Sequence, residues 1–245
     1  IIHNYIEKNV NLILPLILIL VDWVGVICAG RVAFNLRNFI IGNSILHISW
    51  LNSYVTFPFI FVVFFHIADL YHKRLQFWII LEKIFYSCIY ATVTVVVLLY
   101  VTHIASTTSR LYVFLLFILS FLFVMVFRYS IKNIFNMIGI LKLPILLIGG
   151  GKTAGLVLNA IRKDAISLGY NVIGVLDDDG AKREEIGTLP YLGRFIDAEK
   201  VIKKTGVKDV LITAPGLNTE ALNKLIYRIQ PLVRNLSFVP DLIGL

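Results

Sequence analysis

Charged residues are scarce in this chain of 245 residues: Asp, Glu, Lys and Arg make up 16% of it, whereas hydrophobic residues make up 58%. Ordinary soluble domains carry about 25% charged and about 45–50% apolar residues. The shortage is confined to the stretch that ends at Leu143, which consists of long apolar runs. The composition therefore excludes an ordinary soluble monomer. It predicts a membrane domain over residues 1–143 and a soluble domain over residues 144–245.

Cysteine and histidine are too few for several classes of site. The two cysteines, Cys28 and Cys88, lie inside apolar runs, which excludes a disulfide framework and a cysteine zinc site. All five histidines lie in the membrane half, without the spacing of metal ligands. The soluble half has neither residue, and it lacks the Tyr-x-x-x-Lys pair of dehydrogenases and an acid pair beside an electrophile. We predict no catalytic residue and no metal site in this chain.

The first half of the chain contains several long apolar runs. A helix needs about 20 mostly apolar residues to span a bilayer. Four runs meet this length, at approximately residues 12–34, 50–70, 84–103 and 111–131. The first is too long, and too poorly finished by small residues, for a cleaved signal peptide. The sequence therefore predicts four spanning helices.

Basic residues near the ends of these runs predict the orientation, because positive loops stay on the cytoplasmic side. The second connection and the segment after the fourth run are the richer in them, with Lys73, Arg74, Lys83, Lys132 and Lys142. With an even number of spans, we expect a multi-pass membrane protein with both termini in the cytoplasm. Residues 1–143 hold 10 basic against 4 acidic residues, which indicates contact with anionic membrane lipid and no binding of nucleic acid.

Asp22 lies in the middle of the first run, where a carboxylate is costly. One interpretation is a proton or ion relay. The other, which we favour because the other spans supply no chain of acids, is a hydrogen bond between helices with a neutral Asp22.

The second half changes to short aliphatic runs separated by helical segments, a pattern typical of a parallel sheet with crossover helices. We expect strands at about residues 145–148, 171–176, 188–193, 209–213 and 235–239, and helices at 153–164, 197–204 and from the cap Asn218 to before Pro231. Right-handed crossovers then give a Rossmann-like α/β domain with strand order 3-2-1-4-5.

A glycine loop between the first strand and its helix is the chemical feature of this domain. Gly149-x-Gly151-x-x-Ala154 fits the dinucleotide fingerprint with Ala in the third position. Small residues there let a pyrophosphate approach the helix N-terminus, and Asp177, at the end of the second strand, stands where a ribose hydroxyl binds. The alternative is a tight turn that needs glycine and holds no ligand, because the third glycine is absent and Asp178 and Asp179 add negative charge.

The arrangement also resembles a known family. Ser109-Arg110 precedes the last span, Arg128 lies near its end, and the phrases IGGGKTAG, GYNVIGVLDDD, LPYLG and the closing VPDLIGL follow. Together they resemble the N-terminal half of the large polyprenyl-phosphate hexose-1-phosphate transferases, such as the undecaprenyl-phosphate galactose or glucose phosphotransferases of exopolysaccharide and O-antigen synthesis. The resemblance covers essentially the whole chain.

This resemblance implies a membrane-anchoring, regulatory and dimerising region in the bacterial inner (cytoplasmic) membrane, with a homodimer as the expected assembly. A catalytic domain that moves a sugar 1-phosphate from a UDP-sugar to undecaprenyl phosphate, with Mg²⁺, would lie beyond residue 245. At the glycine loop the resemblance favours a uridine nucleotide, whereas the fingerprint alone favours NAD. The alternatives are the front part of a membrane-bound nucleotide-sugar 4,6-dehydratase and a stand-alone membrane scaffold.

Overall fold

The computed structural model describes residues 10–42, 49–71, 73–102, 109–139, 142–179, 187 and 189–239. The chain divides into two compact units, Ile1–Leu141 and Lys142–Leu245, each of which is described by itself. Some residues named in the expectations above lie outside the described residues. They are four of the five histidines, the first residue of the third strand and the last six residues of the closing phrase: His3, His47, His72, His103, Thr188 and residues 240–245.

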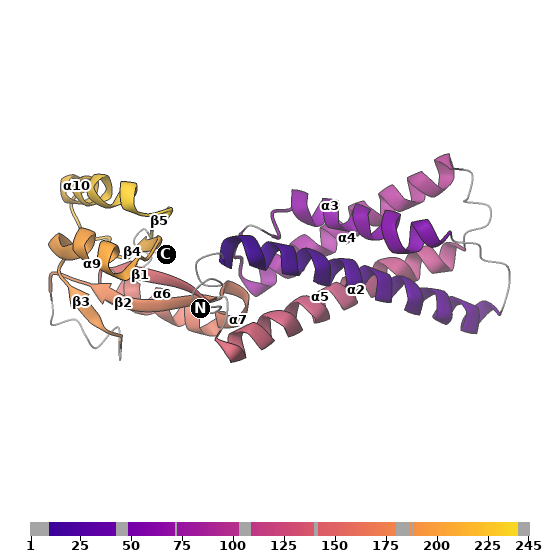
Figure 1. Ribbon diagram of the computed structural model, residues 1–245, viewed down its shortest axis with the longest axis horizontal. Coiled ribbons are helices and arrows are strands. Elements are labelled where there is room, and N and C mark those ends of the chain that lie inside the picture. Colours follow the sequence, from indigo (N-terminus) through magenta and orange to yellow (C-terminus); the bar gives the residue numbers. More distant parts are fainter. Residues whose placement is uncertain are drawn as a thin grey trace. The chain divides into compact units, whose positions relative to one another are not determined.

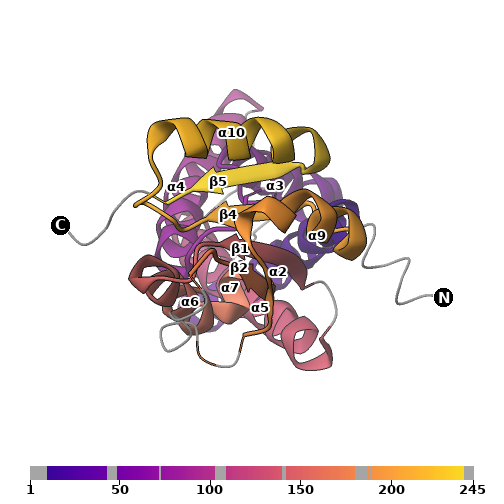
Figure 2. The same ribbon diagram turned by 90° about the vertical axis from the view of Figure 1, so that its left-hand side faces the viewer.

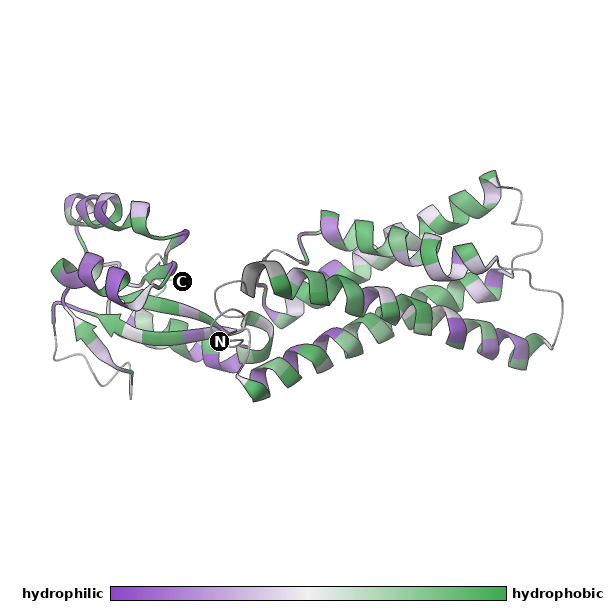
Figure 3. Cartoon of the chain, in the orientation of Figure 1, coloured by the Kyte–Doolittle hydropathy of each residue, from purple (hydrophilic) through white to green (hydrophobic). Residues whose placement is uncertain are grey.

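Unit 1 is a bundle of helices (Figure 1), and most residues along these helices are hydrophobic (Figure 3). Three of the described helices are long and apolar enough to cross a membrane: α2 (Val10–Ile41), α4 (Phe77–Val101) and α5 (Arg110–Ile138). They correspond to the first, third and fourth predicted runs. These three apolar helices indicate a membrane-embedded protein.

The prediction of four spanning helices is wrong, because the second run forms a shorter helix. It consists of a π-helical turn, η1 (Asn52–Thr56), followed by α3 (Phe57–Ile67), and the chain then turns at Ala68. At 1.5 Å per residue this segment is at most about 24 Å long, less than the roughly 30 Å of a hydrocarbon core. Three phenylalanines of α3, Phe57, Phe61 and Phe65, are instead buried inside the bundle.

Small residues let α2 and α5 pack closely. Gly25, Ala29 and Ala33 follow one another every four residues on the buried face of α2, a spacing that brings helix backbones together in membranes. Gly25 lies against Val124 of α5, and Gly30 lies near Tyr112. Contacts that run in opposite directions along the two helices make α2 and α5 antiparallel, so the start of α2 and the end of α5 lie at the same end of the bundle.

A cluster of polar side chains crosses this interface. Asp22 of α2 is fully buried and accepts two hydrogen bonds from Arg128 of α5, at 2.7 Å from Nε and 2.5 Å from a terminal nitrogen. The Tyr71 hydroxyl donates a third, at 2.7 Å, and the Arg128 guanidinium lies over the rings of Phe65 and Tyr71. Asp22 thus joins helices, as we favoured, and its partners are Arg128 of α5 and Tyr71.

Unit 2 is a five-stranded parallel sheet in the order β3-β2-β1-β4-β5, as predicted. The strands are β1 (Leu143–Ile148), β2 (Tyr170–Leu176), β3 (Tyr191–Gly193), β4 (Asp209–Ile212) and β5 (Asn235–Phe238). The helices are α6 (Lys152–Lys163), α7 (Ala165–Leu168), α9 (Ala198–Thr205) and α10 (Thr219–Ile229), with 3-10 turns η3 (Phe195–Asp197) and η4 (Gln230–Leu232). The Asn218 side chain caps α10 by accepting from Ala221 N at 2.7 Å, as expected.

Helices cover both faces of the sheet, with α9 and α10 on one side and α6 and α7 on the other (Figure 2). The central strand β1 shows the reason, because its side chains alternate between two apolar cores. Leu146 and Ile148 pack with α9 and α10, whereas Ile145 and Leu147 pack with α6. The carboxyl ends of β1 and β4 point to the same edge, where the strand order reverses and ligands of such sheets bind.

Candidate nucleotide site at the switch point of the sheet

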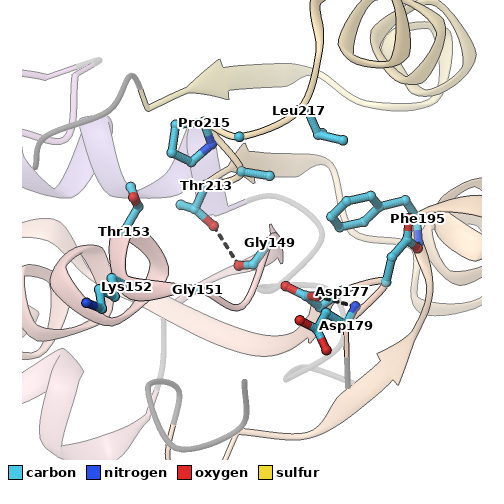
Figure 4. A pocket seen from close by; sticks show the side chains of 13 residues that line it. Gly149, Gly151, Lys152, Thr153, Asp177, Asp179, Phe195, Thr213, Pro215 and Leu217 are labelled. Atoms are coloured by element: carbon cyan, nitrogen blue, oxygen red, sulfur yellow. Dashed lines mark hydrogen bonds between the residues drawn. The ribbon is translucent and has the colours of Figure 1, made fainter. Parts of the chain in front are cut away.

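A cavity of about 590 Å³ lies at this edge of the sheet (Figure 4). Its volume falls within the roughly 300–1,000 Å³ of small-molecule sites. Residues from the loops after β1, β2 and β4, together with η3, line it: Gly149, Gly151, Lys152, Thr153, Asp177, Asp178, Asp179, Phe195, Thr213, Ala214, Pro215, Gly216 and Leu217. The structure therefore brings Gly149, Gly151 and Asp177 of the predicted site together around one cavity.

Gly149 is required by the turn itself. Its φ of +109° is a conformation that side chains disfavour, and a Cβ there would lie 2.7 Å from the backbone carbonyl of Thr213. Thr213 fixes this close approach because its hydroxyl donates to Gly149 O at 2.8 Å and its backbone N–H to Ile148 O at 2.7 Å. Gly149 therefore joins the ends of β1 and β4 regardless of any ligand.

Asp177 organises the loop from the other side. Its carboxylate accepts hydrogen bonds from the backbone N–H of Gly150 and, at 2.6 Å, from that of Asp179. The residue is only 9% exposed, and its own carbonyl accepts from the Tyr191 hydroxyl at 2.9 Å. A carboxylate has about four acceptor positions, so these two bonds leave room for a ribose hydroxyl. The residue has a structural task that the sequence prediction did not include.

Gly151 differs from the other two glycines of the loop. It has no positive φ, and a Cβ there would meet no atom within 4 Å. It precedes α6 as the N-cap, and no side chain caps that helix. The fold needs no glycine here, so the missing side chain leaves space at the first N–H groups of α6. Ala154, by contrast, does not line the cavity; it is fully buried and packs against side chains of β1.

The wall opposite the glycine loop was not predicted. It contains Thr213, Pro215 and Leu217 after β4, and Phe195 of η3. Figure 4 shows Pro215 and Leu217 above the loop and the Phe195 ring beside them, which gives the cavity an apolar side suited to a base. The predicted strand order does place the end of β4 next to β1, so the Thr213 to Leu217 segment could have been inferred from that order.

Charge is divided unevenly around the cavity. In Figure 4 Lys152 lies on one side of the glycine loop, and Asp177 and Asp179 lie on the other. Asp178 is tied to the same region because its carboxylate accepts from Phe195 N at 2.9 Å. A phosphate at the start of α6 would thus meet helix N–H groups and a cation, while the end of β2 is acidic.

The model of the CoA-binding domain family matches residues 66–240, more than two thirds of the chain. The chain belongs to this family. Domains of this family are found in proteins related to sugar transferases and to nucleotide-sugar enzymes. No curated protein matches the chain. The match begins near the end of α3 and so includes α4 and α5 as well as the sheet.

Proposed function

We propose that this chain is the membrane-anchoring and regulatory region of a bacterial sugar transferase that moves a sugar 1-phosphate from a UDP-sugar to undecaprenyl phosphate. In this proposal the cavity of unit 2 binds a uridine nucleotide or a nucleotide sugar, and this binding regulates the transferase according to the concentration of that nucleotide. Two findings support it: the family occurs in proteins related to sugar transferases, and a membrane bundle precedes a Rossmann-like sheet in one chain.

The observation that carries the nucleotide is the open space at Gly151. Two of the three loop glycines are required by the fold: Gly149 by its left-handed backbone conformation and Gly150 by the close approach of the Asp177 carboxylate. At Gly151 no neighbouring atom and no backbone conformation requires a glycine. A diphosphate placed there would accept hydrogen bonds from the start of α6, whose N–H groups have no side-chain cap. The Asp177 carboxylate would take the ribose.

The test is isothermal titration calorimetry of the purified chain in detergent with UDP, UDP-glucose, UDP-galactose and NAD. We expect the uridine nucleotides to bind, and Gly151→Leu to abolish binding because its side chain would fill the space of the diphosphate. Leu156→Ala, on the exposed surface of α6, is the matched control and should bind as the wild type does. Failure of every nucleotide to bind at millimolar concentration would leave the loop as a structural turn.

The same proposal places the bundle in the inner membrane with unit 2 in the cytoplasm. Lys73, Arg74 and Lys83 surround the connection from α3 to α4, and Phe77, at the start of α4, contacts Tyr129 near the end of α5. Basic residues thus gather at the end of the bundle where α2 begins and α5 ends, as expected for a cytoplasmic side. Because α2 and α5 are antiparallel, the start of α2 and the end of α5 lie at one end of the bundle, although only three of the described helices are long enough to span a membrane.

Cysteine labelling in intact cells tests this orientation. In a background with Cys28→Ala and Cys88→Ala, we expect an impermeant maleimide to label Ser49→Cys, which is exposed at the far end of α2. Gln76→Cys, exposed next to the start of α4, should react only after the cells are opened. The reverse pattern would refute the orientation.

A further inference from the structure

Thr153, the second residue of α6, carries a hydroxyl that the fold itself does not use. The residue is only 2% exposed, yet it lines the cavity at the edge of the sheet. Within the described ranges its hydroxyl takes part in no hydrogen bond. Buried hydroxyls in proteins almost always have a hydrogen-bond partner. The described part of the protein supplies none here, so the cavity is the side from which a ligand can supply one.

Thr213, the other threonine that lines the cavity, shows the contrast. Its hydroxyl donates to Gly149 O at 2.8 Å and so belongs to the turn. At position 153 an apolar side chain of the same shape, such as valine, would satisfy packing alone. Threonine adds a donor and two acceptor positions at the wall of the cavity.

The first N–H groups of α6 lie beside this hydroxyl. Gly155 N–H donates to Gly151 O at 3.2 Å, which starts the hydrogen bonding within the helix. The N–H groups of residues 152–154 precede this bond and have no partner within the helix, and the N-cap Gly151 has no side chain to cap them. Figure 4 shows Lys152 on the same side of the glycine loop as Thr153. The helix start, a cation and an unused buried hydroxyl thus indicate one anion position.

The order of groups along a nucleotide decides which phosphate meets Thr153. Asp177, where we propose that the ribose binds, lies on the opposite side of the glycine loop from Thr153 (Figure 4). A nucleotide whose ribose contacts Asp177 therefore places its first phosphate at the open space of Gly151 and directs a second phosphate towards Thr153. Hydrogen bonds to a phosphate oxygen are charge-assisted and strong. A nucleoside monophosphate ends before it reaches this position.

Resting on the nucleotide site proposed above, we propose that Thr153, with Lys152 beside it, forms a second phosphate position that recognises nucleoside diphosphates and their sugar conjugates and discriminates against nucleoside monophosphates. Gly151 makes room for the phosphate that both classes share, whereas the Thr153 hydroxyl acts only on the second phosphate. Thr153 is thus the residue that determines this specificity.

This selectivity distinguishes the donor of the proposed reaction from its product. An oxygen of undecaprenyl phosphate forms a bond to the phosphorus that carries the sugar, the bridging P–O bond of the UDP-sugar breaks, and UMP leaves with the bridging oxygen. The donor has the second phosphate, and the released UMP lacks it. A pocket that requires this phosphate responds to the donor and is insensitive to the UMP that turnover releases.

The experiment titrates the purified chain in detergent with UMP, UDP and UDP-glucose, in EDTA so that no divalent cation bridges a phosphate and a carboxylate. We expect UDP and UDP-glucose to bind at least ten-fold more tightly than UMP, a difference of about 1.4 kcal/mol. UDP-glucose and UMP each carry about two negative charges near neutral pH, so this pair separates the second phosphate from a mere gain in charge.

Two substitutions at position 153 separate the hydroxyl from packing. Thr153→Val keeps the shape and removes the hydroxyl, and we expect it to weaken UDP and UDP-glucose about ten-fold while UMP changes by less than about two-fold. Thr153→Ser keeps the hydroxyl and should retain the wild-type preference. Thr205→Val is the matched control, because it removes a hydroxyl of α9 that donates to Val201 O at 2.8 Å, and it should leave every affinity unchanged. Thermal unfolding without nucleotide checks that each variant folds.

The outcomes separate this inference from the proposed function. Equal binding of UMP and UDP-glucose, an unchanged preference in Thr153→Val, its loss in Thr153→Ser or an equal loss in Thr205→Val would overturn the second phosphate position while leaving a nucleotide site. If none of the three nucleotides binds to the wild type, both the site and its selectivity are refuted.

Discussion

Both units of this protein bury aspartates, and Asp22 of unit 1 and Asp177 of unit 2 are stabilised by different means. In the membrane unit Asp22 receives three hydrogen bonds from the side chains of Arg128 and Tyr71, which come from segments 106 and 49 residues away. In unit 2 Asp177 receives two from backbone N–H groups, one of them only two residues away. Two exposed aspartates, Asp178 and Asp179, follow it in the sequence.

The difference follows from the solvent. Among apolar helices every backbone N–H is already used within its helix, so a charge there needs another charged side chain. At the edge of a sheet, loop N–H groups remain available, and water screens whatever excess charge is left. In the membrane cluster, therefore, the Asp22 carboxylate already accepts hydrogen bonds from Arg128 and Tyr71, and we call this cluster closed. The Asp177 carboxylate in unit 2 still has acceptor positions for a ligand.

The largest effect should come from opening the closed cluster. Arg128→Leu leaves Asp22 buried without its cation, and we expect the bundle to lose about 3–5 kcal/mol of unfolding free energy. Adding Asp22→Leu should recover most of the loss, because two apolar side chains replace the pair. The measurement is reversible unfolding in mixed micelles. Lys73→Leu, which breaks the exposed pair with Asp69, is the control and should cost less than about 1 kcal/mol. Equal losses in the single and double variants would show that the pair does not act as a unit.

A smaller effect is expected in the loop of unit 2. Gly149→Ala combines a left-handed φ with a Cβ placed 2.7 Å from the Thr213 carbonyl, and we expect a loss of about 2–3 kcal/mol. Gly151→Ala meets no atom and should change stability by less than about 1 kcal/mol. Chemical unfolding followed by circular dichroism compares the two. Similar losses at both positions would contradict the assignment of Gly149 to the fold and Gly151 to the ligand.

The smallest effect tests how complete the membrane cluster is. Tyr71→Phe removes one of the three hydrogen bonds to Asp22 while the arginine remains, so we expect a loss of about 1–2 kcal/mol. The same micelle assay measures it. The Tyr112→Phe variant, on the α5 face near Gly30, removes a hydroxyl that does not contact Asp22 and serves as the matched comparison. A loss as large as that of Arg128→Leu would mean that Tyr71, and not the arginine, is the main partner of Asp22.

The sheet was the more predictable part of the fold, for a physical reason. Its strand order follows from chain order and right-handed crossovers, and cap residues such as Asn218 act locally. Apolar length identified α2, α4 and α5 but failed for the run that became η1 and α3, because hydropathy does not reveal where a helix turns to π geometry or ends in a bundle. The pairing of Asp22 with Arg128 joins positions 106 residues apart, which no local pattern specifies.

The sequence predicted where the candidate site lies but not which of its residues serve the fold and which are available to a ligand. The spacing of Gly149, Gly151 and Asp177 located the edge of the sheet where the cavity lies. The spacing could not show that the turn needs Gly149, that Ala154 is buried in the core, or that Asp177 accepts from two loop N–H groups. These roles depend on neighbours that are distant in the sequence, such as Thr213 at the end of β4. Whether a nucleotide occupies the cavity stays a prediction.

The closed pair of Asp22 and Arg128 also constrains how the sequence of this protein can drift over generations. Either substitution alone leaves a buried charge without its partner, so a lineage can hardly pass through a single change at one of the two positions. Related bundles should accordingly carry acid and base together, exchange them together, or replace both with apolar residues. The two alignment columns would then covary although they lie 106 positions apart, while the columns of Lys73 and Asp69, whose exposed pair tolerates loss, would vary independently.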